Sequence, residues 1–223
     1  MSRTFFVTGT DTEVGKTAVT CALLEAAAAR GLQTAAVKPV AAGCDGRGHN
    51  EDALALQAHM TLELDYAQVN PVALEPPIAP HIAAARAGRN IQAARLAGLC
   101  RGVMNAGADL VLIEGAGGWR VPISPRETLA DLAAELRAGV ILVVGMRLGC
   151  INHALLTAEA ILRDGLPLVG WVANQPGERM DCHEENVQTL QRLLPAPCLG
   201  ELPHLRPWSA REAARHLDSR PLL

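Results

Sequence analysis

The sequence predicts an α/β protein built on a single doubly wound, mostly parallel sheet with helices on both faces. Two observations lead to this fold class. Short runs rich in Val, Leu and Ile alternate with longer segments rich in Ala and Leu along almost the whole chain, and this alternation is typical of parallel strands joined by helices. The length of 223 residues and the 49% apolar content suit one compact domain. We therefore expect a single domain over residues 1–223.

The first elements have clear local signals. Residues 3–8 are a β-rich apolar run, and residues 16–30 are an alanine-rich helix that ends at a glycine. Residues 34–37 are a second strand. It ends at Lys38-Pro39, because proline lacks an N–H and keeps the preceding residue extended. Residues 41–50 hold three glycines and are expected to form a loop.

The rest of the chain continues the alternation. Residues 70–80 carry four prolines and are expected to form a surface loop, and residues 115–118 are a glycine-rich turn. The apolar patterns predict strands at 109–113, 140–144, 168–172 and 198–199. They predict helices at 52–59, 81–87, 91–106, 129–137, 151–163, 184–194 and 209–217.

Composition argues against several other classes of protein. The net charge is −3 and no basic stripe indicates a nucleic-acid partner. The longest strongly apolar run, residues 140–146, is too short to span a bilayer, and the N-terminus leads directly into a strand without a signal peptide. The six cysteines show no C-x-x-C spacing and are expected to be reduced thiols. We expect a cytoplasmic protein without a membrane partner.

The first strand leads into the most informative stretch, Val7-Thr8-Gly9-Thr10-Asp11-Thr12-Glu13-Val14-Gly15-Lys16-Thr17. This is the layout of a phosphate-binding loop, in which backbone N–H groups and the positive end of the next helix hold an anion. Five residues rather than four separate Gly9 from Gly15, so the loop is a variant of the G-x-x-x-x-G-K-[ST] pattern. The pattern predicts that Lys16 reaches the β- and γ-phosphates and that Thr17 binds Mg²⁺. The expected fold is therefore of the P-loop NTPase type.

Polar residues follow three other predicted strands: Lys38, Glu114 and Asn174. Because ligands of doubly wound sheets gather at the carboxyl ends of strands, we expect these residues around the nucleotide. Each also has a structural explanation, as a solvated lysine, a cap and a turn residue respectively. Asp52 opens a helix, where it can cap that helix or join Thr17 and Glu114 in a three-oxygen site for Mg²⁺.

Two further stretches can meet a ligand through their backbone. Gly115-Ala116-Gly117-Gly118 lacks the spacing of a dinucleotide fingerprint, because Arg120 stands where the third glycine belongs. A close backbone approach to a phosphate or a base fits better. Residues 148–153 open a helix after a buried strand, so they are either an ordinary helix start or a set of free N–H groups that hold a carboxylate.

These segments, in this order, resemble the dethiobiotin synthetase family of the biotin pathway. The match covers most of the chain and includes residues 9–17, 38–40, 52–56, 69–71, 80–81, 114–119, 148–153, 172–174 and 199–203. The resemblance implies an ATP-dependent ring closure of 7,8-diaminopelargonate with CO₂. A carbamate attacks the γ-phosphate, and the second amine then closes the ring of dethiobiotin by displacing phosphate from a carbamic–phosphoric anhydride.

The resemblance also implies roles for individual residues. Lys16 and Lys38 are catalytic, and Mg²⁺ is held by Thr17, Asp52 and Glu114. ATP is contacted by Glu13, Val14, Gly15, Lys16, Thr17, Ala18, Asp52, Glu114, Gly115, Ala116, Gly117, Asn174, Pro203, His204 and Leu205. The protein is expected to be a homodimer. The diamine is contacted by Thr12, Lys38 and Ala42 and, across the twofold interface, by Gly149, Cys150, Ile151 and Asn152.

Two positions depart from the family pattern and keep alternatives open. Ala42 stands where many members carry a serine that touches the substrate, so a paralogue with a shifted substrate is one alternative. His204 replaces an aromatic residue such as tryptophan and concerns only nucleotide packing. A switch ATPase of the ParA/MinD type is the other alternative. Those proteins carry an extra lysine early in the loop, where this chain has Thr10 and Asp11.

Overall fold

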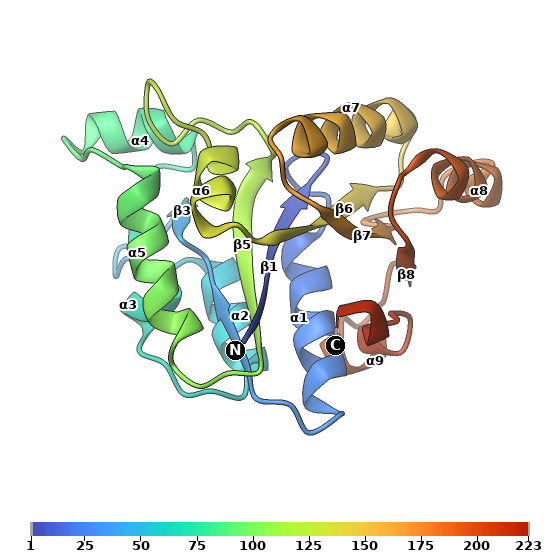
Figure 1. The fold of residues 1–223 in the computed structure, drawn as a ribbon, viewed down its shortest axis with the longest axis horizontal. Coiled ribbons are helices and arrows are strands. Elements are labelled where there is room, and N and C mark those ends of the chain that lie inside the picture. The colour runs from blue at the N-terminus through green and yellow to red at the C-terminus, as the bar shows by residue number, and fades with distance from the viewer. Residues whose placement is uncertain (1, 223) are drawn as a thin grey trace.

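The computed structural model describes residues 2–222, and its main sheet has six parallel strands in the order β2-β5-β1-β6-β7-β8 (Figure 1). These strands are β1 (Arg3–Gly9), β2 (Thr34–Val37), β5 (Leu110–Gly118), β6 (Gly139–Gly145), β7 (Leu168–Asn174) and β8 (Cys198–Leu202). Since β1 lies in the middle, the loop that follows it opens at the centre of the carboxyl edge, where doubly wound sheets bind ligands.

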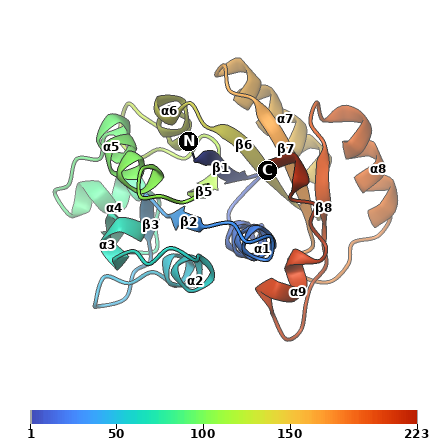
Figure 2. The same cartoon turned by 60° about the horizontal axis from the view of Figure 1, so that its bottom comes forward.

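Helices cover both faces of this sheet (Figure 2). One face carries α1 (Lys16–Ala28), α2 (Glu51–His59) and α9 (Ala210–Ala214), and the other carries α5 (Ala93–Met104), α6 (Leu129–Leu136), α7 (Cys150–Arg163) and α8 (His183–Leu193). Successive strand residues point to opposite faces. Accordingly, Leu112 joins the core under α1, whereas Ile113 joins the core under α5 and α6. The predicted fold class is confirmed.

The helices begin where the sequence offers a local signal. The side chain of Asn50 accepts a hydrogen bond from the N–H of Ala53 at 3.2 Å and so caps α2. Thr128 and Asp131 form a capping box at the start of α6. Pro80 opens the short helix α4 (Pro80–Arg86), a position where its missing N–H costs nothing.

Two predicted loops contain regular structure. The expected loop at 41–50 begins inside β3 (Val40–Ala42), and the expected loop at 70–80 contains β4 (Val72–Leu74). The two strands pair in parallel as a separate small sheet. A short helix, α3 (Tyr66–Val69), precedes β4 and was not expected. Elements of three or four residues have too few positions for a periodic pattern, so only their tertiary pairing reveals them.

Three predicted boundaries at the carboxyl edge are also corrected. Residues 115–118 are not a turn but the last part of β5, which still pairs with β1 at Gly118 after an irregularity. Asn174 does not follow β7 but is its final residue. The final helix is shorter than the expected 209–217 and is followed by a 3₁₀ turn, η1 (Arg220–Leu222).

No helix within residues 2–222 is long and apolar enough to cross a membrane. The six cysteines are all free thiols, and four of them are buried: Cys21, Cys44, Cys100 and Cys150.

Candidate active site

The phosphate loop between β1 and α1 is shaped by its backbone and by Asn174. Gly15 has a φ of 83°, in the left-handed region that favours glycine. A Cβ at this position would lie 2.1 Å from Nδ2 of Asn174, which leaves no room for a side chain. Nδ2 of Asn174 donates to the carbonyl of Val14 at 2.7 Å. Asn174, at the end of β7, therefore contacts the phosphate loop directly and fixes the backbone at Val14.

Lys16 opens α1 with its ammonium group folded back over this loop. Its Nζ donates to the carbonyl of Asp11 at 3.0 Å, and the residue is only 7% exposed. Burial, and next the neighbouring ammonium of Lys38, lower the pKa of Lys16 to about 8. A buried, weakly paired cation beside backbone N–H groups is suited to bind a polyanion.

Lys38 lies at the centre of a cluster of charged side chains beside the loop. Its Nζ donates to Oδ2 of Asp52 at 2.7 Å and to Oε1 of Glu114 at 2.6 Å. The hydroxyl of Thr17 donates to the same Oε1 at 2.9 Å. Lys38 and Glu114 are almost fully buried, whereas the side chain of Asp52 is 46% exposed. The structure thus brings these four predicted residues together from α1, β5, α2 and the end of β2.

The charges of this cluster stabilise one another. Burial alone would lower the pKa of Lys38, but the carboxylates of Glu114 and Asp52 outweigh burial and raise it. Burial opposes ionisation of Asp52 as well, but the Lys38 ammonium outweighs it, so the pKa of Asp52 is lowered. Both groups are therefore charged at neutral pH. Asp52 is not the cap of its helix, because Asn50 has that role.

The backbone of Lys38 is fixed by two residues that end α3. The N–H of Lys38 donates to the carbonyl of Val69 at 2.7 Å, and Nδ2 of Asn70 donates to the carbonyl of Lys38 at 2.7 Å. Asn70 itself is buried. These two hydrogen bonds fix the backbone of Lys38, which directly follows the four-residue strand β2. The sequence around Lys38 does not predict them.

The oxygen atoms of this cluster fit a hard divalent cation. Oε2 of Glu114 is buried and has no hydrogen-bond partner within residues 2–222. Carboxylate and hydroxyl oxygens of Glu114, Asp52 and Thr17 are the ligands that Mg²⁺ prefers. In the part of the chain that is described, no three His, Cys, Asp or Glu side chains could hold a metal ion. A metal at this site therefore also needs hydroxyl, water or nucleotide oxygens.

A cavity of about 780 Å³ opens over the cluster. Ten of the predicted residues line it, namely Thr12, Glu13, Gly15, Lys16, Thr17, Lys38, Ala42, Asp52, Ala116 and Gly117. The remaining lining residues are Ala41, Asn50, residues 77–80, Val121 and Pro122. Of these, only Pro80 belongs to a segment, 80–81, that resembles the substrate side of the family's site. Val14, Glu114 and Gly115 lie beneath this surface, and Ala18 belongs to the first turn of α1.

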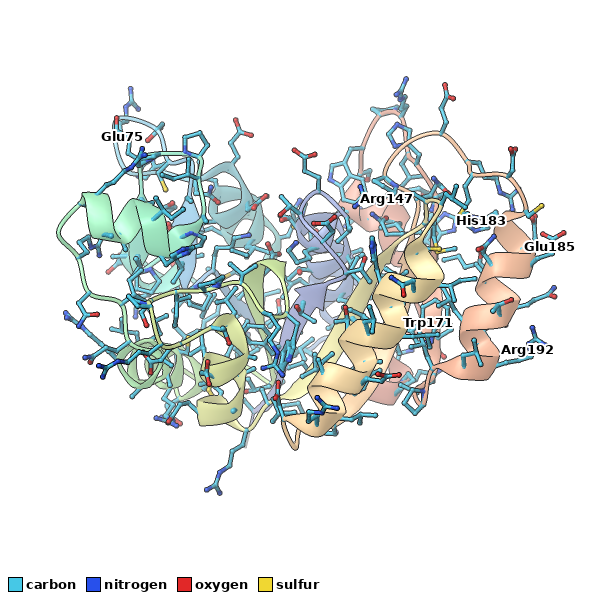
Figure 3. All side chains as sticks on the ribbon, turned by 90° about the horizontal axis from the view of Figure 1, so that it is seen from above. Glu75, Arg147, Trp171, His183, Glu185 and Arg192 are labelled. Atoms are coloured by element: carbon cyan, nitrogen blue, oxygen red, sulfur yellow. The ribbon has the colours of Figure 1, made fainter. Side chains whose placement is uncertain are left out.

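A second cavity of about 510 Å³ lies beyond Asn174, between β8 and the start of α8. Pro203 and His204 line it, together with Gln175, His183 and Glu201. Oε1 of Gln175 and Nδ1 of His183 are buried and have no hydrogen-bond partner in residues 2–222. Leu205 instead packs against the core under α1. In Figure 3 His183 lies at the start of α8, whereas Glu185 and Arg192 are farther along that helix; both are exposed.

The predicted residues at the start of α7 lie apart from both cavities. Gly149, Cys150, Ile151 and Asn152 line neither of them, and Cys150 is buried in the core. Just before them lies Arg147, which is labelled in Figure 3. Its guanidinium pairs with Asp11 of the phosphate loop at 2.5 Å. Residue patterns gave no reason to connect these two exposed side chains.

The sheet order and the loop define a P-loop nucleotide-binding protein, and solved structures support this class. A MinC:MinD cell division complex from Aquifex aeolicus matches with a TM-score of 0.61 at 14% identity, over 98% of this chain and 95% of that chain. MinD from Pyrococcus horikoshii, solved with Mg-ADP, matches with a TM-score of 0.56 at 16% identity, over 96% and 85%. At these identities the likeness establishes the fold alone.

Sequence relatives identify the family. Residues 3–212 match a family model described as an AAA domain. The ATP-dependent dethiobiotin synthetase BioD of Cellvibrio japonicus is 60% identical over 99% of this chain and 98% of its own. That of Pseudomonas paraeruginosa is 57% identical over 98% and 97%. The chain belongs to the family of ATP-dependent dethiobiotin synthetases. These relatives favour a synthetase over the switch ATPase that the fold alone would also allow.

Proposed function

We propose that this protein closes the ureido ring of dethiobiotin from 7,8-diaminopelargonate, CO₂ and ATP. The observation that carries the proposal is the position of Lys38, bonded to Glu114 at 2.6 Å and to Asp52 at 2.7 Å directly beside the phosphate loop. A pure nucleotide-binding module has no need for a buried lysine between two carboxylates next to its phosphate site. The full-length similarity to dethiobiotin synthetases gives the substrates.

The reaction proceeds in three balanced steps. One amine of the diamine adds to CO₂ and loses a proton, which gives a carbamate. A carbamate oxygen attacks the γ-phosphorus of ATP, and ADP leaves. The second amine then attacks the carbonyl carbon of this carbamic–phosphoric anhydride, loses a proton and displaces phosphate. Phosphoryl transfer depends mainly on positioning and charge stabilisation.

Lys16 and Lys38 supply this charge stabilisation. Lys16, with backbone N–H groups of residues 13–18, holds the β- and γ-phosphates. Lys38 faces the same cavity as Thr12 and Ala42, so its ammonium group can neutralise the carbamate and the phosphoryl group passing between them. Asn174, Pro203, His204 and Leu205 are assigned to the nucleobase end of ATP. The second cavity, beyond Asn174, supports this assignment.

Mg²⁺ is part of the proposal, since ATP-dependent enzymes of this fold generally use it. Thr17, Asp52 and Glu114 would hold it, and it would supply positive charge at the β- and γ-phosphate oxygens. Glu114→Gln and Asp52→Asn are each expected to raise the Mg²⁺ concentration for half-maximal activity by about tenfold or more. Titration of activity against Mg²⁺ measures this. Unchanged half-saturation in both variants would remove these carboxylates from the metal site.

The protein is also proposed to act as a cytoplasmic homodimer. Leu148, 95% exposed, stands immediately before the start of α7, and Leu156 and Leu162 of that helix are about half exposed. A twofold contact of α7 would cover them. It would also direct the start of α7, at Gly149–Asn152, toward the substrate carboxylate of the partner, where the positive helix end favours an anion.

One assay separates the proposed function from its alternatives. ADP release is measured with bicarbonate, with and without 7,8-diaminopelargonate, and the product is identified by mass spectrometry. We expect ADP release to depend on the diamine and dethiobiotin to appear in equal amount. ADP release that ignores the diamine would indicate a switch ATPase. Turnover of only another diamine would indicate a paralogue in which Ala42 has shifted the substrate.

A further inference from the structure

One wall of the main cavity is formed by residues on either side of a buried tryptophan. Ala116 and Gly117 line the cavity before Trp119, and Val121 and Pro122 line it after Trp119. Trp119 itself is 3% exposed and does not line the cavity. The position of this wall, residues 116–122, therefore depends on the contacts that Trp119 makes on the side away from the cavity.

Asp164 holds Trp119 from the far end of α7. Its Oδ2 accepts from Nε1 of Trp119 at 2.7 Å, and its Oδ1 accepts from Nη2 of Arg120 at 2.8 Å. Asp164 is the C-cap residue directly after α7, where a negative charge faces the negative end of the helix dipole. An aspartate at this end does not stabilise the helix. We therefore connect its presence with the two hydrogen bonds that it accepts from Trp119 and Arg120.

Residues 116–122 are tightly packed, so a shift of Trp119 would also move the residues of the wall that line the cavity. The ring of Trp119 meets the ring of Phe6 edge to face, with centroids 6.0 Å apart. Gly117 has a φ of 65°, and a Cβ there would lie 2.9 Å from Cγ2 of Val121. The two sides of the wall are thus in close contact, and neither can move without the other.

We propose that Asp164 is a positioning residue that sets the affinity of the active site for the diamine. It does not touch the cavity, and acts by fixing the indole of Trp119 and hence the wall at 116–122. The proposal rests on the proposed function in one respect, namely that the diamine occupies this cavity. Lys16 and Thr17 belong to other elements, so their contacts with the nucleotide phosphates do not depend on Asp164. Ala116 and Gly117 of the wall are also expected to contact ATP, so a smaller effect on ATP accompanies the effect on the diamine.

Kinetics of four variants test the proposal. Asp164→Ala removes both acceptors, Trp119→Phe removes only the indole donor, and Asp164→Asn keeps an acceptor. Asp164→Ala and Trp119→Phe are each expected to raise the KM for the diamine by a factor of about three to ten, as for the loss of one buried hydrogen bond, with kcat nearly unchanged and a smaller rise in the KM for ATP. Asp164→Asn restores most of the affinity. Arg120→Ala, at an exposed ion pair, changes the KM by less than about twofold.

A double variant and an indole signal distinguish positioning from general destabilisation. Asp164→Ala combined with Trp119→Phe is expected to be no worse than either single variant, because both remove the same bond. Hydrogen exchange of the ¹⁵N-labelled Trp119 indole, assigned by its loss in Trp119→Phe, is expected to accelerate in Asp164→Ala. An unchanged exchange rate overturns the proposal.

The two proposals fail in different ways. If the wild-type protein converts the diamine and Asp164→Ala has the same KM for it, the role of Asp164 is wrong and the proposed function stands. If the wild-type protein does not convert the diamine, the proposed function fails. Additive effects of Asp164→Ala and Trp119→Phe also overturn the positioning role.

Discussion

Lys16 shows how a single buried charge links nucleotide binding to pH. Its pKa of about 8 lies below the ordinary 10.5 because of burial and the nearby Lys38. The folded state therefore binds fewer protons than the unfolded state between these values. The cost of burying this charge is fully present below pH 8, and it disappears as the pH rises from about 8 to 10.5.

This shift predicts that ATP binding takes up a proton at alkaline pH. Below pH 8 Lys16 is already charged, whereas above pH 8 it must gain a proton to hold the phosphates. The affinity for ATP should fall by up to about tenfold per pH unit above 8. Calorimetry without diamine, in two buffers of different ionisation enthalpy at pH 8.5, should show uptake of about three quarters of a proton. Lys16→Arg should show none, because arginine does not titrate there. Equal uptake in both proteins would contradict the prediction.

Removal of the Lys38 ammonium group is expected to lower the stability of the protein as well as its activity. Glu114 is fully buried, so removal of the Lys38 ammonium leaves its carboxylate without an ion-pair partner, bonded only to the Thr17 hydroxyl. Lys38→Met should lower the free energy of unfolding at pH 7 by about 3–5 kcal/mol. Adding Glu114→Gln should recover much of this loss, since an amide carries no charge. Urea unfolding of the single and double variants measures both. A Lys38→Met protein as stable as the wild type would mean that the buried pair contributes little.

At the scale of elements, the end of β7 and the phosphate loop form one rigid unit. Asn174 supports the carbonyl of Val14, and its amide nitrogen fills the space that a side chain at position 15 would need. Asn174 was expected to contact the nucleobase. The structure gives it an additional contact with the loop, which no local pattern indicates because the two segments are 160 residues apart.

A suppressor experiment tests this contact. Gly15→Ala should reduce ATP affinity by about a hundredfold or more, because the new Cβ meets Asn174 at 2.1 Å and the backbone has a positive φ. Adding Asn174→Ala should remove the steric part and leave the backbone strain, worth about 1–2 kcal/mol. Because Asn174→Ala also removes a contact assigned to the nucleobase, the single Asn174→Ala variant is the reference. Gly15→Ala should weaken ATP binding less in the Asn174→Ala protein than in the wild type. An equal loss in both proteins would show that the amide is not the obstacle.

Local patterns could predict the core strands but not everything that borders the site. Strands β1, β5, β6 and β7 are buried apolar runs, so their sequences identify them. Strands β3 and β4 have three residues each and depend on pairing with one another. The continuation of β5 through four residues of mostly glycine depends on its contact with β1. The sequence predicted that Lys38, Asp52 and Glu114 lie near the phosphate loop. It did not predict that Lys38 pairs directly with both carboxylates, because these contacts depend on how the sheet and α2 assemble.

At the scale of the whole molecule, the two ends of α7 have different roles. Its C-cap residue, Asp164, is hydrogen-bonded to the cavity wall of its own chain. Its N-terminal residues line neither cavity of that chain, which suits a role at a neighbouring active site. A homodimer with α7 at the twofold axis would contain two equivalent sites, each with residues from both chains.

Complementation between two inactive variants tests this shared site. Lys16→Ala disables the phosphate loop of its own chain, and Asn152→Ala removes the Asn152 side chain from the helix start offered to the partner. In a mixed dimer, one site receives both defects and the other receives none. Random exchange of equal amounts gives mixed dimers in half of the population, so about a quarter of wild-type activity should return. Each variant alone should stay inactive or bind the diamine poorly, and Asn152→Ala should bind ATP normally. If native mass spectrometry detects mixed dimers and no activity returns, each chain must complete its own site, because only then do both sites of a mixed dimer carry one defect.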